Sequence, residues 1–117
     1  MHIIFTIGIL TIADFESMMK KGGSYCLILV CEYNKDKDLQ TLEAYCHNYP
    51  TVKCYYGLEG AKDRGQPDTS FNTHFQNKGT PAFFFFKNGN QAIAIVHDST
   101  KAPYKAHDVD AAFKSVQ

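Results

Sequence analysis

Four cysteines, at positions 26, 31, 46 and 54, offer the most direct chemistry in this 117-residue sequence. A thiolate is both a nucleophile and a metal ligand, so such residues serve in redox exchange, covalent catalysis or metal binding. The spacing Cys-x-x-Cys, typical of dithiol sites, does not occur. The first residues lack a basic segment and a small-residue cleavage site, so we expect no signal peptide. We therefore expect reduced thiols and a cytoplasmic location.

Cys31 is the candidate nucleophile, because it lies just before a predicted helix whose N-terminal dipole would favour a thiolate. The acidic neighbours Glu32, Asp36 and Asp38 would oppose that effect. Cys26 is five residues away, an odd offset that places it on the opposite face of any shared strand. No other cysteine is expected near Cys31 to resolve a mixed disulfide.

Metal binding is not expected. The five histidines have no zinc-like spacing, and Cys46 and His47, adjacent on a predicted helix, face different directions. No phosphate-binding loop or hydrolase motif occurs either, so we expect no cofactor.

The clearest structural signal lies in residues 79–91. Gly79-Thr80-Pro81 precedes an apolar run, 82–86, that ends in four consecutive phenylalanines. Strand side chains alternate between faces, so both faces would carry two phenylalanines, as in a central strand covered on both sides. Asn88-Gly89 predicts a two-residue hairpin turn, since both central positions need positive φ. Pro81 cannot donate a ladder hydrogen bond, so it should begin this strand.

The other segments predict alternating strands and helices. Apolar runs predict strands over 3–7, 25–33 and 51–56, and alternation predicts a strand over 91–97 that pairs with the phenylalanine strand. Helices should follow N-caps at Thr11 and Asp108, extend over about 39–49, and pass through Phe71 and Phe75. The polar residues 57–67 predict an exposed loop, either a functional lid or a surface insertion.

Together, Gly79-Thr80-Pro81, the apolar strand, Lys87-Asn88-Gly89 and the returning strand resemble the second half of a thioredoxin. The resemblance implies an α/β thioredoxin fold: a central mixed sheet of four or five strands, with helices on both faces. It also implies one domain over residues 1–117. In that family the bond equivalent to Thr80–Pro81 is cis and faces the active site.

The resemblance fails at the active-site motif. A thioredoxin carries Trp-Cys-Gly-Pro-Cys between its central strand and the next helix, whereas this sequence has no tryptophan. Three alignments remain open for the missing motif: Glu32–Lys35, Asp36–Leu39, or Cys31–Asn34 if the strand ends early. The family's buried acid and buried lysine are also missing under these alignments.

Two functional hypotheses follow. The first is a binding module without dithiol chemistry, in which a protein or extended peptide pairs with the backbone beside Gly79, Thr80 and Pro81. The second is a single-cysteine redox protein acting through Cys31. The net formal charge is zero, so we expect no binding to nucleic acid or to a membrane surface. The sequence does not indicate the oligomeric state.

Overall fold

The structure is a computed structural model that describes residues 7–9, 11–58, 81–95 and 104–117. In chain order, the described elements are β1 (Gly8–Ile9), α1 (Ile12–Lys21), β2 (Ser24–Val30), a 3-10 helix (Glu32–Asn34), α2 (Lys35–Asn48), β3 (Lys53–Leu58), β4 (Ala82–Lys87), β5 (Asn90–Ile95) and α4 (Ala106–Val116).

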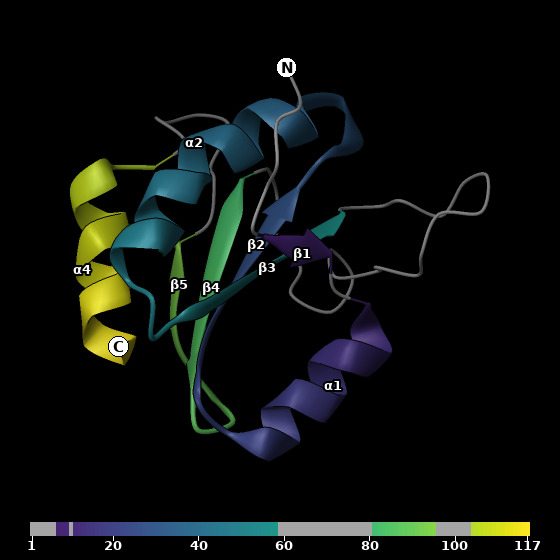
Figure 1. Cartoon of the computed structure of the whole chain (residues 1–117), viewed down its shortest axis with the longest axis vertical. Coiled ribbons are helices and arrows are strands. Elements are labelled where there is room, and N and C mark those ends of the chain that lie inside the picture. The colour runs from purple at the N-terminus through teal and green to yellow at the C-terminus, as the bar shows by residue number, and fades with distance from the viewer. Residues whose placement is uncertain (1–6, 10, 59–80, 96–103) are drawn as a thin grey trace.

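The strands form one mixed sheet in the order β1-β3-β2-β4-β5. The first three strands in this order run parallel, and β4 and β5 are antiparallel to their neighbours. Figure 1 shows α1 on one side of the sheet and α2 and α4 on the other. The predicted α/β architecture, with helices on both faces of a mixed sheet, is confirmed.

Strand β4 places large apolar side chains on both faces of the sheet. Phe83 and Phe85 belong to the apolar cluster under α2 and α4, while Phe84 and Phe86 belong to the cluster under α1. All four are at most 2% exposed. The strand lies between β2 and β5, so it is interior rather than at an edge. The prediction from consecutive phenylalanines is therefore confirmed.

Hydrogen bonds at both ends hold α1 in place. Thr11 caps the helix as predicted, since its side-chain oxygen accepts a hydrogen bond of 3.2 Å from the Asp14 N–H. At the other end, the hairpin turn of Asn88 and Gly89 has positive φ at both positions, 52° and 83°. The Asn88 N–H donates to the carbonyl of Gly23, 2.9 Å away, so the hairpin tip is tied to the residues that follow α1.

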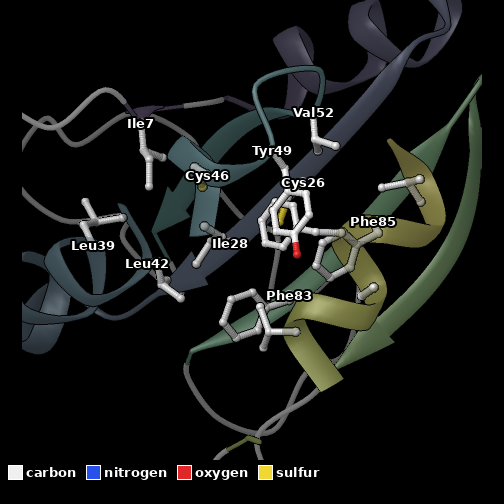
Figure 2. Packing of buried hydrophobic residues seen from close by; sticks show 14 of the residues in the cluster. Ile7, Cys26, Ile28, Leu39, Leu42, Cys46, Tyr49, Val52, Phe83 and Phe85 are labelled. Carbon is white, nitrogen blue, oxygen red and sulfur yellow. The ribbon is translucent and has the colours of Figure 1, made fainter. Parts of the chain in front are cut away.

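Aromatic rings organise the opposite face. Phe113 of α4 is stacked on Tyr49 with 5.1 Å between ring centroids and meets Phe85 edge-on at 5.0 Å. The hydroxyl of Tyr49 donates to a carboxylate oxygen of Asp110, 3.2 Å away. Figure 2 shows side chains of this cluster between the sheet and the helices.

The predicted first strand, 3–7, lies outside the described residues except for Ile7, which comes just before β1, Gly8–Ile9, the strand that pairs with β3. The predicted start of the last helix is wrong. Helix α4 begins at Ala106 with Lys105 as its N-cap, so Asp108 lies in the first turn instead of capping it. The helix dipole also favours a carboxylate in the first turn. This explains why Asp108 marks the helix although it lies three residues after the N-cap.

The predicted 57–67 loop begins too early, because Gly57 and Leu58 continue β3 and pair with the last residues of β2. The rest of that loop, the helix through Phe71 and Phe75, and residues 96–97 of the last strand lie outside the described residues. None of the helices in the described part of the chain is long and apolar enough to cross a membrane.

Candidate functional site

Cys31 lies where the central strand stops. Strand β2 ends at Val30, and Cys31 is the N-cap of the 3-10 helix that leads into α2. Its thiol is free and its side chain is partly exposed. The predicted strand over 25–33 is therefore too long by three residues. The reason is pairing: among the described residues, the pairing of β2 with β3 ends at Val30 and Leu58.

Pro81 lies at the same edge of the sheet. In the antiparallel pairing of β2 with β4, Leu29 is opposite Ala82. The next residues outward, Val30 and Pro81, are therefore neighbours at the end of the two strands, and Cys31 follows directly. Pro81 is buried and immediately precedes β4, as predicted. We call this region, made by Cys31 and Pro81, the Cys31 edge.

The other predicted members of this site, Gly79 and Thr80, lie outside the described residues, and so does the predicted cis bond between Thr80 and Pro81. Of the three alignments for the missing dithiol motif, Cys31–Asn34 required β2 to end early, and that condition is met. Residues 35–39 lie within α2, and residues 32–34 form the 3-10 helix.

Cys31 lies shortly before helix α2. The helix begins four residues after Cys31, and Asp36 and Asp38 occupy its first turn. Tyr33, in the 3-10 helix, is 94% exposed, an unusual position for a large aromatic side chain.

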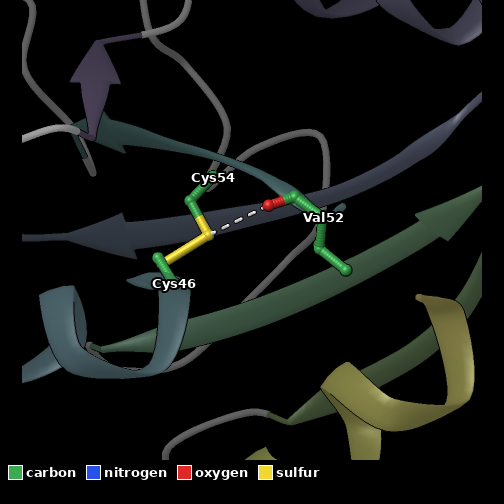
Figure 3. Close-up of a disulfide and its surroundings, with 3 residues drawn as sticks. All are labelled: Cys46, Val52 and Cys54. Atoms are coloured by element: carbon green, nitrogen blue, oxygen red, sulfur yellow. Dashed lines mark hydrogen bonds between the residues drawn. A yellow bond between two sulfur atoms is a disulfide. The ribbon is translucent and has the colours of Figure 1, made fainter. Parts of the chain in front are cut away.

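The expectation of four reduced thiols is wrong, because Cys46 and Cys54 form a disulfide (Figure 3). Their Cα atoms are 6.2 Å apart. Residues 49–52 form only a short connection between α2 and β3, so the last turn of the helix lies over the start of the strand. The signal was present in the sequence: Cys46 lies on the apolar stripe of its helix, and Cys54 alternates with Val52 and Tyr56 on one strand face.

Cys26 is the third cysteine on this face of the sheet. It is 0% exposed, and burial raises the pKa of its thiol well above the ordinary value. It is the register partner of Cys54 on the neighbouring strand. We call Cys26, Cys46 and Cys54 the cysteine cluster.

The Cys31 edge and the cysteine cluster are well separated. Five strand residues span about 16 Å, which is the distance along the chain from Cys26 to Cys31. The eleven helical steps from Lys35 to Cys46 likewise span about 16 Å. No second thiol therefore approaches Cys31. Within the described part of the chain, no group of three or more His, Cys, Asp or Glu side chains is arranged to hold a metal ion.

No family of known proteins matches this sequence, and no curated protein sequence does. Solved structures do match. A thioredoxin from Fasciola hepatica superposes with a TM-score of 0.71 at 12% identity, over 96% of this chain and 100% of the other. A Plasmodium falciparum thioredoxin gives a TM-score of 0.71 at 10% identity, with the same coverage. The chain has the thioredoxin fold.

A further match comes from a structural study of thiol resolution in yeast mitochondrial 1-Cys peroxiredoxin through glutathione and thioredoxin systems. It has a TM-score of 0.72 and 13% identity, covering 94% of this chain and 95% of that one. At these identities the likeness establishes the thioredoxin fold alone.

Proposed function

We propose that this thioredoxin-fold chain is a protein-binding module that takes an extended segment of a partner at the Cys31 edge. The observation that carries the proposal is the register of β2 with β4, which brings Pro81 beside the end of the central strand and so beside Cys31. The partner segment would pair with the backbone N–H and C=O groups of Thr80, in the manner of strand addition.

Tyr33 supports a protein partner. Its ring is 94% exposed and lies two residues from Cys31. Tyrosine is enriched at protein interfaces, because it offers a large apolar surface with a hydroxyl at one end. In this proposal, the partner segment extends from Pro81 past Cys31 and covers the Tyr33 ring.

A second function is favoured by one specific observation: Cys31 is a free, partly exposed thiol just before a helix N-terminus. In this alternative, Cys31 forms a mixed disulfide with a cysteine of the partner and acts as a single-thiol redox residue. We rank it second because the nearest thiols that could resolve a mixed disulfide are about 16 Å away along strand or helix.

Peptide binding tests the first proposal. Extended peptides that bind the folded chain are first selected from a random display library. Their affinities are then measured for the wild type and for two variants of the Cys31 edge, Cys31→Arg and Tyr33→Ala. We expect both to weaken binding by about tenfold or more, equivalent to 1.4 kcal/mol. The matched control is Asn90→Arg, an exposed position at the hairpin end of the sheet. Binding that is weakened by the control and not by the edge variants would refute the proposal.

Insulin reduction with a dithiol donor separates the two functions. We expect no rate above that of the donor alone, because Cys31 has no nearby resolving thiol. Multiple turnover abolished by Cys31→Ser would instead establish the redox function. A cytoplasmic location remains a prediction, to be checked by imaging a tagged chain.

A further inference from the structure

Within the cysteine cluster, Cys54 lies within disulfide range of both Cys26 and Cys46. Cys26 and Cys54 are register partners on neighbouring parallel strands, which lie about 4.8 Å apart. The Cα atoms of Cys46 and Cys54 are 6.2 Å apart. Both separations fall within the roughly 4.4–6.8 Å that disulfides span between Cα atoms. Cys54 is therefore the residue that can bond to either of the other two.

The side chains share one face of the sheet. Cys26 and Cys46 belong to the apolar cluster under α2 and α4, and Cys54 packs against the same cluster. Figure 2 shows Cys26 and Cys46 pointing into this layer, and Figure 3 shows the disulfide between α2 and β3. A bond from Cys54 to Cys26 would require no side chain to cross the sheet.

The three cysteines differ in how exposed their side chains are to solvent. Cys26 is 0% exposed, Cys46 is 9% exposed, and Cys54 is partly exposed. Thiol–disulfide exchange depends on access to the sulfur that is attacked. A thiol in solution therefore meets Cys54 first, and Cys46 is the leaving group.

The reduced form of Cys54 already has a hydrogen-bond acceptor. Its sulfur lies 4.0 Å from the carbonyl oxygen of Val52 (Figure 3). A disulfide sulfur has no proton to donate, whereas the thiol of reduced Cys54 could donate to this carbonyl without moving. The same arrangement thus accommodates both oxidation states.

We propose that Cys26, Cys46 and Cys54 form a reversible thiol–disulfide site for external thiols, in which Cys54 is the exchanging sulfur and Cys26 its second internal partner. This site is distinct from the Cys31 edge. It would give the chain a redox activity in addition to protein binding.

Exchange with an external thiol proceeds in two steps. An external thiolate attacks the Cys54 sulfur, a mixed disulfide forms, and the Cys46–Cys54 bond breaks. Cys46 leaves with the electron pair and takes up a proton. A second external thiolate then attacks the external sulfur and releases Cys54 as a thiol. Two external thiols are oxidised to one disulfide, and the protein pair gains two electrons and two protons.

Cys26 offers the alternative to the second external thiol. Its thiolate attacks Cys54 in the mixed disulfide, a Cys26–Cys54 bond forms, and the external thiolate leaves with the proton that Cys26 gave up. The external thiol is regenerated, so the net change is a transfer of the bond from Cys46 to Cys26. Because burial raises the pKa of Cys26, this route is slower than reclosure by Cys46.

Reversibility is tested on the folded full chain carrying Cys31→Ser, so that the result does not depend on the function of Cys31. The chain is reduced with dithiothreitol, transferred to oxidised glutathione, quenched with acid, alkylated and mapped by mass spectrometry. We expect the Cys46–Cys54 bond to open without denaturant and to re-form. A bond that opens only in denaturant, or thiols that stay free under oxidised glutathione, would overturn the proposal.

The function of Cys26 is tested by adding Cys46→Ser to that background. Oxidised glutathione should then yield a Cys26–Cys54 disulfide with no retained glutathione. The matched control, which also carries Cys26→Ala, should keep one glutathione on Cys54. Equal retention in the two variants would refute the proposed function of Cys26. Cys46→Ala, checked for folding by circular dichroism, replaces the serine variant if that variant unfolds.

Discussion

Cys26 and Cys31 are five residues apart on one segment, and their surroundings are opposite. Cys26 lies within β2 at 0% exposure, between two paired strands and beneath two helices. Cys31 lies one residue past the strand, partly exposed, where β3 has ended. The same side chain is therefore a core residue in one position and an accessible thiol in the other. Pairing of the backbone, rather than residue type, decides which of the two can meet a partner.

The largest effect is expected for Phe85→Ala, which tests this contrast between Cys26 and Cys31. Phe85 is opposite Cys26 in the β2–β4 register and contacts Phe113 edge-on. Removing a buried phenylalanine side chain should lower the free energy of unfolding by about 3–5 kcal/mol. It should also make Cys26 accessible to iodoacetamide in the folded protein, while labelling of Cys31 stays as it is. Urea unfolding and mass spectrometry measure the two effects.

Phe84→Ala is the matched control for that variant. Phe84 is equally buried, but it belongs to the cluster under α1. A comparable loss of stability with Cys26 still protected is the expected result. Labelling of Cys26 in both variants would mean that the two faces of the sheet do not protect it separately.

The next effect concerns the disulfide, replaced in the variant Cys46→Ser/Cys54→Ser. The bond joins residues eight apart, and the entropy of closing so short a loop corresponds to about 2.5 kcal/mol of stability. The oxidised protein should lose about this much in urea unfolding, and adding reductant should have no further effect on the variant. Cys31→Ser should change stability by less than about 0.5 kcal/mol. A larger change at Cys31 would remove the contrast between the two regions.

The pH dependence of stability distinguishes Cys26 from the rest of the chain. Burial raises the pKa of folded Cys26 above the value of about 8.5 for an unfolded thiol. The folded state therefore retains a proton that the unfolded state loses, and stability falls as pH rises above that value. The slope for one proton is at most about 1.4 kcal/mol per pH unit.

The measurement is the difference in unfolding free energy between the wild type and Cys26→Ala from pH 7 upward. The difference should be constant below the unfolded pKa and should shift against the wild type above it. Burial also raises the pKa of Tyr45, Tyr49 and Tyr104 on this face. These tyrosines are present in both proteins, so their ionisation cancels in the difference. A flat difference up to pH 10 would contradict the buried environment of Cys26.

The smallest effect is expected for Ser24→Ala. The Ser24 hydroxyl donates to the carbonyl of Val116 and joins the start of β2 to the end of α4. Losing one partly buried hydrogen bond should cost about 1 kcal/mol and leave Cys31 labelling unchanged. Ser115→Ala is the control, since the Ser115 hydroxyl donates only within its own helix. Equal costs for the two serines would show that the hydrogen bond between the elements has no special effect.

The fold was predictable because its signals are local and redundant. Four consecutive phenylalanines require a covered strand, and Asn88-Gly89 requires a tight hairpin, whatever the rest of the chain does. The candidate site was less predictable. The end of β2 depends on where β3 ends, and the Cys46–Cys54 bond depends on how a helix lies over a strand. Both are contacts between segments, which periodicity within one segment does not report.

The hairpin tip has a consequence for protein engineering. The turn at Asn88 and Gly89 is tied to α1, since the Gly23 N–H donates to the Asn88 side chain, 65 residues away in sequence. A methyl group on Gly89 would come within 2.7 Å of the carbonyl oxygen of Met19. Exposed turns ordinarily accept inserted tags, reporters and new chain termini. This turn should not, because an insertion there would break the hydrogen bonds that join the hairpin tip to the residues after α1.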